Sequence, residues 1–191
     1  MIQIVKDSDT RPWFFLQTAH TTYGIRVMKT GHLEHLYYGE RITVDSQDPS
    51  SCAPLVIQRA FAPGNTCTYD REHPQISMED VCLEVGTLGK GDIREPFLEV
   101  RFADGSVTSD FTFDSYEVIT LKEREQCLHA SGLPRIYSEA ETDSAECLQI
   151  ILQDVMNHVE LQLFYTVFEE CDVITRSARL INHSDASVTL N

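Results

Sequence analysis

The sequence predicts an all-β protein folded as an antiparallel β-sandwich. Residues 148–190 give the clearest indication, because residues 160–168 and 172–180 alternate between apolar and polar positions, the period that half-buries a strand. About ten short stretches of this kind follow one another with turn residues between them. Only residues 121–130 have the composition of a helix, which disfavours a βαβ arrangement. Since one meander cannot bury both of its faces, the other strands must form a second layer over it.

The N-terminal region predicts another antiparallel meander. Strands are expected at residues 13–18, 22–28 and 32–38, each rich in aromatic and β-branched side chains. Residues 19–21 are short enough for a hairpin connection. Gly31 can adopt the positive φ that a tight turn needs before the third strand.

The middle of the chain alternates loops with further strands. Residues 44–64 contain a polar loop at 45–51 and an apolar run that Pro54 and Pro63 bracket, and residues 66–74 are again loop-like. Loops of this length are often functional, the alternative being mobile loops without a role. Strands are expected at residues 96–102 and 107–120. A short helix then follows, which Gly132 ends within a few turns.

Composition limits the class of protein. The chain of 191 residues is 42% hydrophobic, enough for one domain with a substantial core. Its formal net charge of -15 argues against nucleic acid and anionic membranes as partners, because phosphate binding needs clustered Lys and Arg. No apolar run is long enough for a membrane span, and the first ten residues do not resemble a secretory signal. We therefore expect a cytoplasmic protein.

Neither the cysteines nor the histidines predict a metal site or a cofactor. Six cysteines are scattered without a C-x-x-C pair, which in a cytoplasmic chain indicates free thiols. His32 and His35 are three residues apart on an expected strand, so their rings point to opposite faces and cannot share one ion. We expect no metal and no cofactor.

No catalytic motif is present in the residues themselves. The glycines of residues 86–96 do not form a phosphate-binding loop, because no G-K-[ST] precedes a helix there. The chain also lacks the G-x-S-x-G and H-E-x-x-H signatures. Carboxylates are plentiful, but paired-carboxylate chemistry requires two of them to face one sugar, which a sequence does not show.

Six short motifs follow one another along the chain. They are GHLEHLYYG at 31–39, RAFAP at 59–63, GDIREP at 91–96, DGS with SDF at 104–111, GLP at 132–134 and FEECDVITRS at 168–177. In this order they resemble the motifs of the N-terminal domain of glycoside hydrolase family 36 α-galactosidases (melibiases). Each is weak alone, but six in register over nearly the whole chain are specific.

The resemblance implies a β-supersandwich of the galactose-mutarotase-like type in residues 1–191, truncated at Asn191 and followed by a catalytic (β/α)₈ barrel. It implies that the parent enzyme hydrolyses terminal α-galactosides of oligosaccharides by a retaining mechanism. The two catalytic aspartates of the family lie on the barrel. No residue of this chain is therefore assigned a catalytic role, and the chain alone is expected to be inactive.

The resemblance also implies a homo-oligomer, a tetramer in the family, in which the N-terminal domain lends polar side chains to a neighbour's sugar pocket. One of these is an Asp directly before R-A-F, where this chain has Gln58, which can hydrogen-bond a hydroxyl but carries no charge. Arg71 is the candidate for an arginine contributed by the following loop. For Asp92 and Arg94 we expect an ion pair that fixes the glycine-rich turn.

Two other functions stay open. A stand-alone carbohydrate-binding or aldose-epimerase-like sandwich would need one of its histidines and a glutamate as acid and base in one cleft. The candidate histidines are His32, His35, His129 and His158. A purely structural oligomerisation module is the remaining hypothesis.

Overall fold

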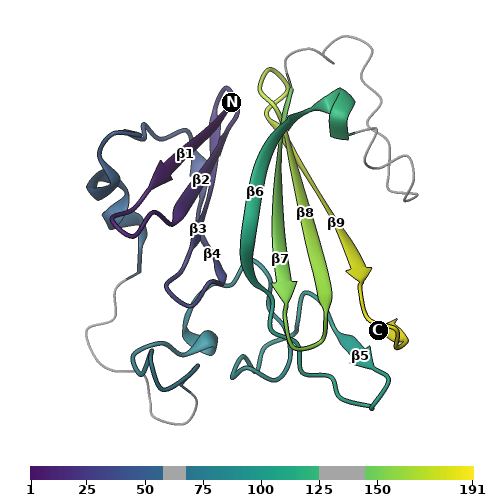
Figure 1. Ribbon diagram of the computed structural model, residues 1–191. Helices are drawn as coiled ribbons and strands as arrows, with labels where there is room; N and C mark the ends of the chain where they lie inside the picture. Colours follow the sequence, from purple (N-terminus) through teal and green to yellow (C-terminus); the bar gives the residue numbers. More distant parts are fainter. Residues whose placement is uncertain (58–67, 125–144) are drawn as a thin grey trace.

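Two four-stranded antiparallel sheets face each other in the computed structural model, which describes residues 1–57, 68–124 and 145–191 (Figure 1). The first sheet contains, in spatial order, β1 (Ile2–Lys6), β2 (Pro12–Gln17), β3 (Thr21–Val27) and β4 (Leu33–Glu40). The second contains β6 (Thr112–Thr120), β7 (Glu146–Asp154), β8 (Val159–Phe168) and β9 (Val173–Asn182). In each sheet consecutive strands pair as a meander, so the predicted antiparallel sandwich is confirmed.

Smaller elements lie at the margins of the sandwich. Strand β5 (Val100–Phe102) pairs antiparallel with β10 (Val188–Leu190) in a separate ribbon. Two 3₁₀ helices, η1 (Pro49–Leu55) and η2 (Met78–Asp80), lie in the long connection between β4 and β5. No helix in the described part of the chain is long and apolar enough to cross a membrane.

The core fills the space between the two sheets. Alternate residues of β8 point inward, and Leu161, Leu163 and Tyr165 are each at most 1% exposed. They pack with residues of the first sheet such as Phe14, whose ring meets that of Tyr116 on β6 edge-on at 5.0 Å between centroids. Burying one such aliphatic side chain contributes about 1.5–3 kcal/mol, so Leu163→Ala is expected to cost roughly 2–5 kcal/mol.

A short segment extends the edge of β4 and brings a carboxylate between the sheets. The backbone N–H of His35 donates to the carbonyl of Cys82 at 2.7 Å, and the N–H of Glu84 donates to the carbonyl of Leu33 at 2.9 Å. An isolated bridge joins Glu34 to Leu83. This pairing fixes Glu84 beside β3 and β4.

The structure differs from the sequence-based expectation in three places. Strand β1 was not predicted, because both of its faces are covered: Ile4 packs into the central core and Val5 into a separate cluster under η1. The expected strands at residues 96–102 and 107–120 are shorter, as β5 and β6. The predicted helix is present at residues 121–124, and its remainder lies outside the described residues.

Candidate functional site

The two predicted sugar-contact residues lie in the connection between β4 and β5. Gln58 is outside the described residues. Arg71 is exposed beside a turn in which the backbone N–H of His73 donates to the Asp70 carboxylate at 2.7 Å, and the His73 ring lies 2.9 Å from the same oxygen. Within the described part of the chain, Arg71 has no hydrogen-bond or ion-pair partner. Its guanidinium is free to bind an acceptor on another molecule.

The expected ion pair between Asp92 and Arg94 is present and bidentate. The Nε and Nη2 atoms of Arg94 donate to the two carboxylate oxygens of Asp92 at 2.7 and 2.9 Å. Burial alone would raise the pKa of the Asp92 carboxyl, but the hydrogen bonds from Arg94 and its charge together hold that pKa below its usual value. The Arg94 guanidinium also donates to the carbonyls of Met78 and Val81 at 3.0 and 2.8 Å. The loop is thereby tied to η2.

This loop presents an apolar side chain to the outside. Ile93, at its tip, is 82% exposed, although its neighbours Asp92 and Arg94 are fixed. An open groove of about 340 Å³ runs along the loop, and Leu83, Glu84, Gly86, Asp92, Arg94, Glu95, Pro96 and Phe97 line it. Arg71 forms no hydrogen bond or ion pair with this loop. Of the described residues that the sequence predicted for the site, only Asp92 and Arg94 therefore contact each other.

A buried carboxylate, not predicted from the sequence, organises the space between the sheets. The hydroxyls of Tyr23 and Tyr165 both donate to Glu84 at 2.7 Å, and Nη1 of Arg176 lies 3.2 Å from its Oε1 atom. Burial, together with the negative charge of Glu84, raises the pKa of both tyrosines well above the usual value. The signal in the sequence is one acid within the otherwise apolar residues 81–85.

The epimerase hypothesis can be compared with this cluster. Atom Nδ1 of His35 lies 3.7 Å from Oε2 of Glu84, so the structure does bring a histidine and a glutamate together. However, the Glu84 side chain is 2% exposed and its oxygens already have two tyrosines and Arg176 as partners. A carboxylate so enclosed is poorly placed to exchange a proton with a bound sugar. The cluster therefore supports the fold better than it supports acid–base chemistry.

His32 has its partners outside this cluster. His32 is buried, with Thr30 at its Nδ1 atom and Asp110 at its Nε2 atom, each at 2.9 Å. Burial would raise the pKa of Asp110, but hydrogen bonds from His32 and Lys90 and their charges lower it to about 2. His129 lies outside the described residues. Among the described residues, no three or more His, Cys, Asp or Glu side chains lie together as potential metal ligands.

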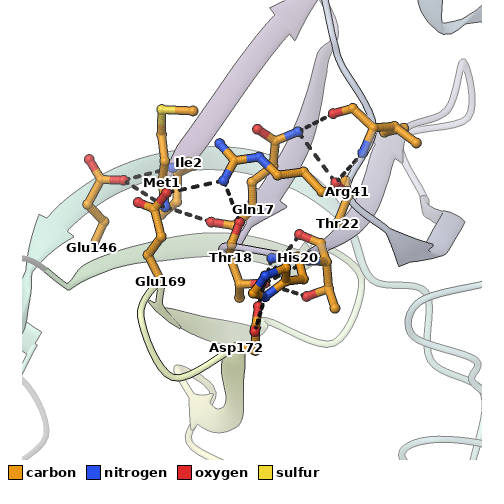
Figure 2. A network of polar contacts seen from close by, with 12 residues as sticks. Met1, Ile2, Gln17, Thr18, His20, Thr22, Arg41, Glu146, Glu169 and Asp172 are labelled. Atoms are coloured by element: carbon orange, nitrogen blue, oxygen red, sulfur yellow. Dashed lines mark hydrogen bonds and ion pairs between the residues drawn. The ribbon is translucent and has the colours of Figure 1, made fainter.

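A polar network joins the two sheets at one end (Figure 2). Asp172, in the β8–β9 turn, accepts hydrogen bonds from the Thr18 hydroxyl at 2.7 Å and from the backbone N–H of His20 at 2.8 Å. Its other oxygen lies 2.5 Å from Nδ1 of His20. These contacts, the His20 ring first, lower the pKa of Asp172 to about 2. Asp172 has a φ of 52°, which Asp tolerates better than most residues.

Three further contacts reinforce this connection. Arg41 donates from Nη1 to the Thr18 carbonyl at 2.7 Å and to the Glu169 carboxylate at 3.2 Å (Figure 2). The backbone N–H of Ala19 donates to the Glu169 carbonyl at 3.0 Å. The β2–β3 turn and the β8–β9 turn are thus bound to each other through both side chains and backbone.

Comparisons with known proteins agree with the fold and the motifs. Residues 31–191 match the family model described as the glycosyl hydrolase family 36 N-terminal domain. A bifunctional alpha-galactosidase/sucrose kinase from Mediterraneibacter gnavus is 38% identical over 93% of this chain, which covers 18% of that protein. Alpha-galactosidase AgaA of Geobacillus stearothermophilus is 32% identical over 88% of this chain and 21% of its own length.

Solved structures give the same result. The galactosidase domain of alpha-galactosidase-sucrose kinase AgaSK superposes with a TM-score of 0.77 at 34% identity, covering 98% of this chain and 24% of that one. The alpha-galactosidase of Lactobacillus brevis gives 0.75 at 29% identity, over 97% and 23%. The chain therefore spans about a fifth of the length of the curated relatives that it matches. On these matches, the chain belongs to the glycosyl hydrolase family 36 N-terminal domain family.

Proposed function

We propose that residues 1–191 are the N-terminal, non-catalytic β-sandwich of a cytoplasmic α-galactosidase whose (β/α)₈ barrel follows this chain. The enzyme removes terminal α-D-galactosyl residues from oligosaccharides by a retaining mechanism. The observation that carries the proposal is similarity to alpha-galactosidases along 93% of the chain, although the chain makes up only 18% and 22% of two of them. Three described cysteines, Cys52, Cys82 and Cys147, are free thiols, which agrees with a reducing compartment.

An activity assay on two proteins tests this proposal. The full-length protein should release galactose from raffinose, and proton NMR should show the α-anomer of galactose as the first product. The chain of 191 residues, folded by circular dichroism, should show no turnover above the buffer rate. Turnover by these residues alone, or a β-anomer as first product, would contradict the proposal.

A finer role concerns the sugar pocket of a neighbouring subunit. The proposal assigns Arg71 and Gln58 to that pocket in a homo-oligomer. The guanidinium of Arg71, which is exposed and has no partner among residues 1–57, 68–124 and 145–191, supports it. In the full-length enzyme, Arg71→Ala should raise KM or lower kcat/KM about tenfold without changing the oligomeric state. The matched control is Arg101→Ala, since Arg101 is also exposed and has no hydrogen-bond or ion-pair partner among the described residues. Unchanged kinetics in both variants would leave a purely structural module as the better account.

A further inference from the structure

A cleft of about 160 Å³ opens between the sheets, where β3 and β4 face β8 and β9. Thr21, Tyr23, Tyr38, Tyr165, Asp172, Ile174 and Arg176 line it. Because side chains alternate along a strand, Ile174 and Arg176 share one face of β9. Asp172 lines the cleft from the turn that precedes this strand. A closed cavity of about 150 Å³ accepts benzene, so this cleft, at about 160 Å³, has room for the bare ring of one pyranose.

One wall of the cleft is aromatic. Tyr38, at the rim, is 66% exposed, and its ring lies 5.8 Å from that of Tyr23. The Tyr23 ring in turn lies 6.2 Å from that of Tyr165, which is 1% exposed and forms the floor. Rings therefore extend from the rim to the floor, and their flat faces suit the C–H face of a pyranose ring.

The facing wall is polar and held in place. The Arg176 guanidinium donates to the Glu84 carbonyl at 2.9 Å, and its central carbon lies 4.4 Å from the centre of the Phe97 ring. Its five N–H groups exceed these contacts, so donors remain for a ligand. Asp172, fixed by Thr18 and His20, keeps one acceptor site on Oδ2, because both sites of Oδ1 are already used. Hydroxyl groups, which both donate and accept, match such a mixture.

The charges around the cleft favour a neutral ligand. Arg176 is paired with Glu84, so its positive charge is already balanced. Asp172 adds a negative charge opposite the tyrosines, and the chain carries a formal net charge of -15. An anion would meet no excess positive charge here.

We propose that this cleft binds one neutral sugar ring, with Tyr38 and Tyr23 against its apolar face and Arg176 and Asp172 on its hydroxyls. This inference is independent of the hydrolase assignment, because it concerns binding by the residues of this chain only. It adds a ligand site to a region of the sandwich that the pocket role of Arg71 does not involve.

Methyl NMR on isoleucine-labelled protein tests the proposal directly. Ile174 lines the cleft, whereas Ile119 lies on the opposite face of the same sheet in a separate cluster. Titration with D-galactose or D-glucose should shift the Ile174 methyl signal in a saturable way and leave the Ile119 signal unchanged. The Ile174→Val variant assigns the signal.

A pair of neighbouring tyrosines provides the matched variants. Tyr38 pairs with Tyr23 on the cleft side of the sheet, whereas Tyr37 pairs with Gly24, whose missing Cβ would meet Phe15 of the outer cluster. Tyr38→Ala should weaken sugar binding at least about tenfold, and Tyr37→Ala should leave it within a factor of about two. Equal effects of the two variants would contradict the proposal.

Two further outcomes would overturn it. No shift of the Ile174 signal at saturating galactose or glucose would exclude a sugar site in the cleft. A shift with D-galacturonate but with neither neutral sugar would show an anion site instead. Should residues 1–191 fail to fold alone, the same Ile174 signal can be followed in the full-length protein, where it still reports on this cleft and not on a distant pocket.

Discussion

Glu84 brings side chains from separate segments of the chain together. It accepts hydrogen bonds from Tyr23 on β3 and Tyr165 on β8, and it pairs with Arg176 on β9. Removing one partner of a buried charge pair costs more than the pair contributes, because the remaining groups lose their hydrogen bonds without regaining water.

Glu84→Ala should therefore destabilise the protein by about 3 kcal/mol. Tyr23→Phe, which removes a single hydroxyl from the same carboxylate, should cost only about 1 kcal/mol. Urea unfolding followed by fluorescence of Trp13 measures both. Equal midpoints for the two variants would show that Glu84 does not organise the cluster.

Asp110 gives a prediction about acid stability. Its folded pKa is about 2, below the usual 3.8, because His32 and Lys90 bond the ionised form. A lowered carboxyl pKa adds stability above pH 4, and this stability is lost as the pH falls toward 2. The contribution at neutral pH is roughly 2 kcal/mol.

Asp110→Asn should remove this contribution and flatten the dependence of unfolding free energy on pH between 4 and 2. The control is Asp185→Asn, because Asp185 is exposed and has no hydrogen-bond or ion-pair partner among the described residues. Denaturant midpoints at a series of pH values give the comparison. A slope in Asp110→Asn as steep as in the unmodified chain would contradict the assigned cause.

Single residues were the hardest feature to predict from the sequence. The ion pair of Asp92 and Arg94 is confirmed. It could be predicted because two residues of opposite charge lie two positions apart in one tight turn. The role of Glu84 was not predicted, since its partners are 61 and 81 residues away along the chain. Patterns within a short stretch of sequence do not show contacts between residues so far apart in the chain.

At the scale of elements, the β2–β3 and β8–β9 turns form one joint. Asp172 binds Thr18 and His20, and the Glu169 carbonyl accepts from Ala19. Both acidic residues belong to the motif at 168–177. The motif therefore fixes one hairpin of the second sheet against a hairpin of the first.

Asp172→Ala should loosen this joint without unfolding the sandwich. The amide hydrogens of Ala19 and His20 should exchange at least about tenfold faster. The N–H of His20 loses its acceptor, and the N–H of Ala19, which donates to Glu169, is next to it in the chain. Glu170→Ala, at an exposed neighbour in the same turn with no partner among the described residues, is the matched control. Amide exchange measured by NMR should distinguish the two variants. Equal exchange rates of Ala19 and His20 in both would show that Asp172 does not hold the two turns together.

Elements were predicted where one face is polar. Strands β7, β8 and β9 alternate clearly, and their order and pairing are as expected. Strand β1 has apolar residues on both faces, so its five residues alternate only over Ile2, Gln3 and Ile4, too few for a periodic signal. Strand β5 is three residues long, too short for a periodic signal.

At the scale of the whole molecule, the proposed function makes this two-sheet sandwich the N-terminal domain of a longer enzyme. The fold class followed from periodicity alone, but the family followed from six motifs in order. The candidate sugar contacts rest on the resemblance, since the structure describes only Arg71 of the two. A sequence gives no direct signal for a pocket that two subunits would share.

The length of the reading frame that encodes this chain tests the central claim most directly. Sequencing the transcript and measuring the intact mass of the native protein give it without any assay. We expect a product as long as the relatives, of which this chain makes up 21% and 22%, with a barrel of alternating strands and helices after residue 191. A native protein that ends at Asn191 would contradict the account and favour a stand-alone sugar-binding sandwich.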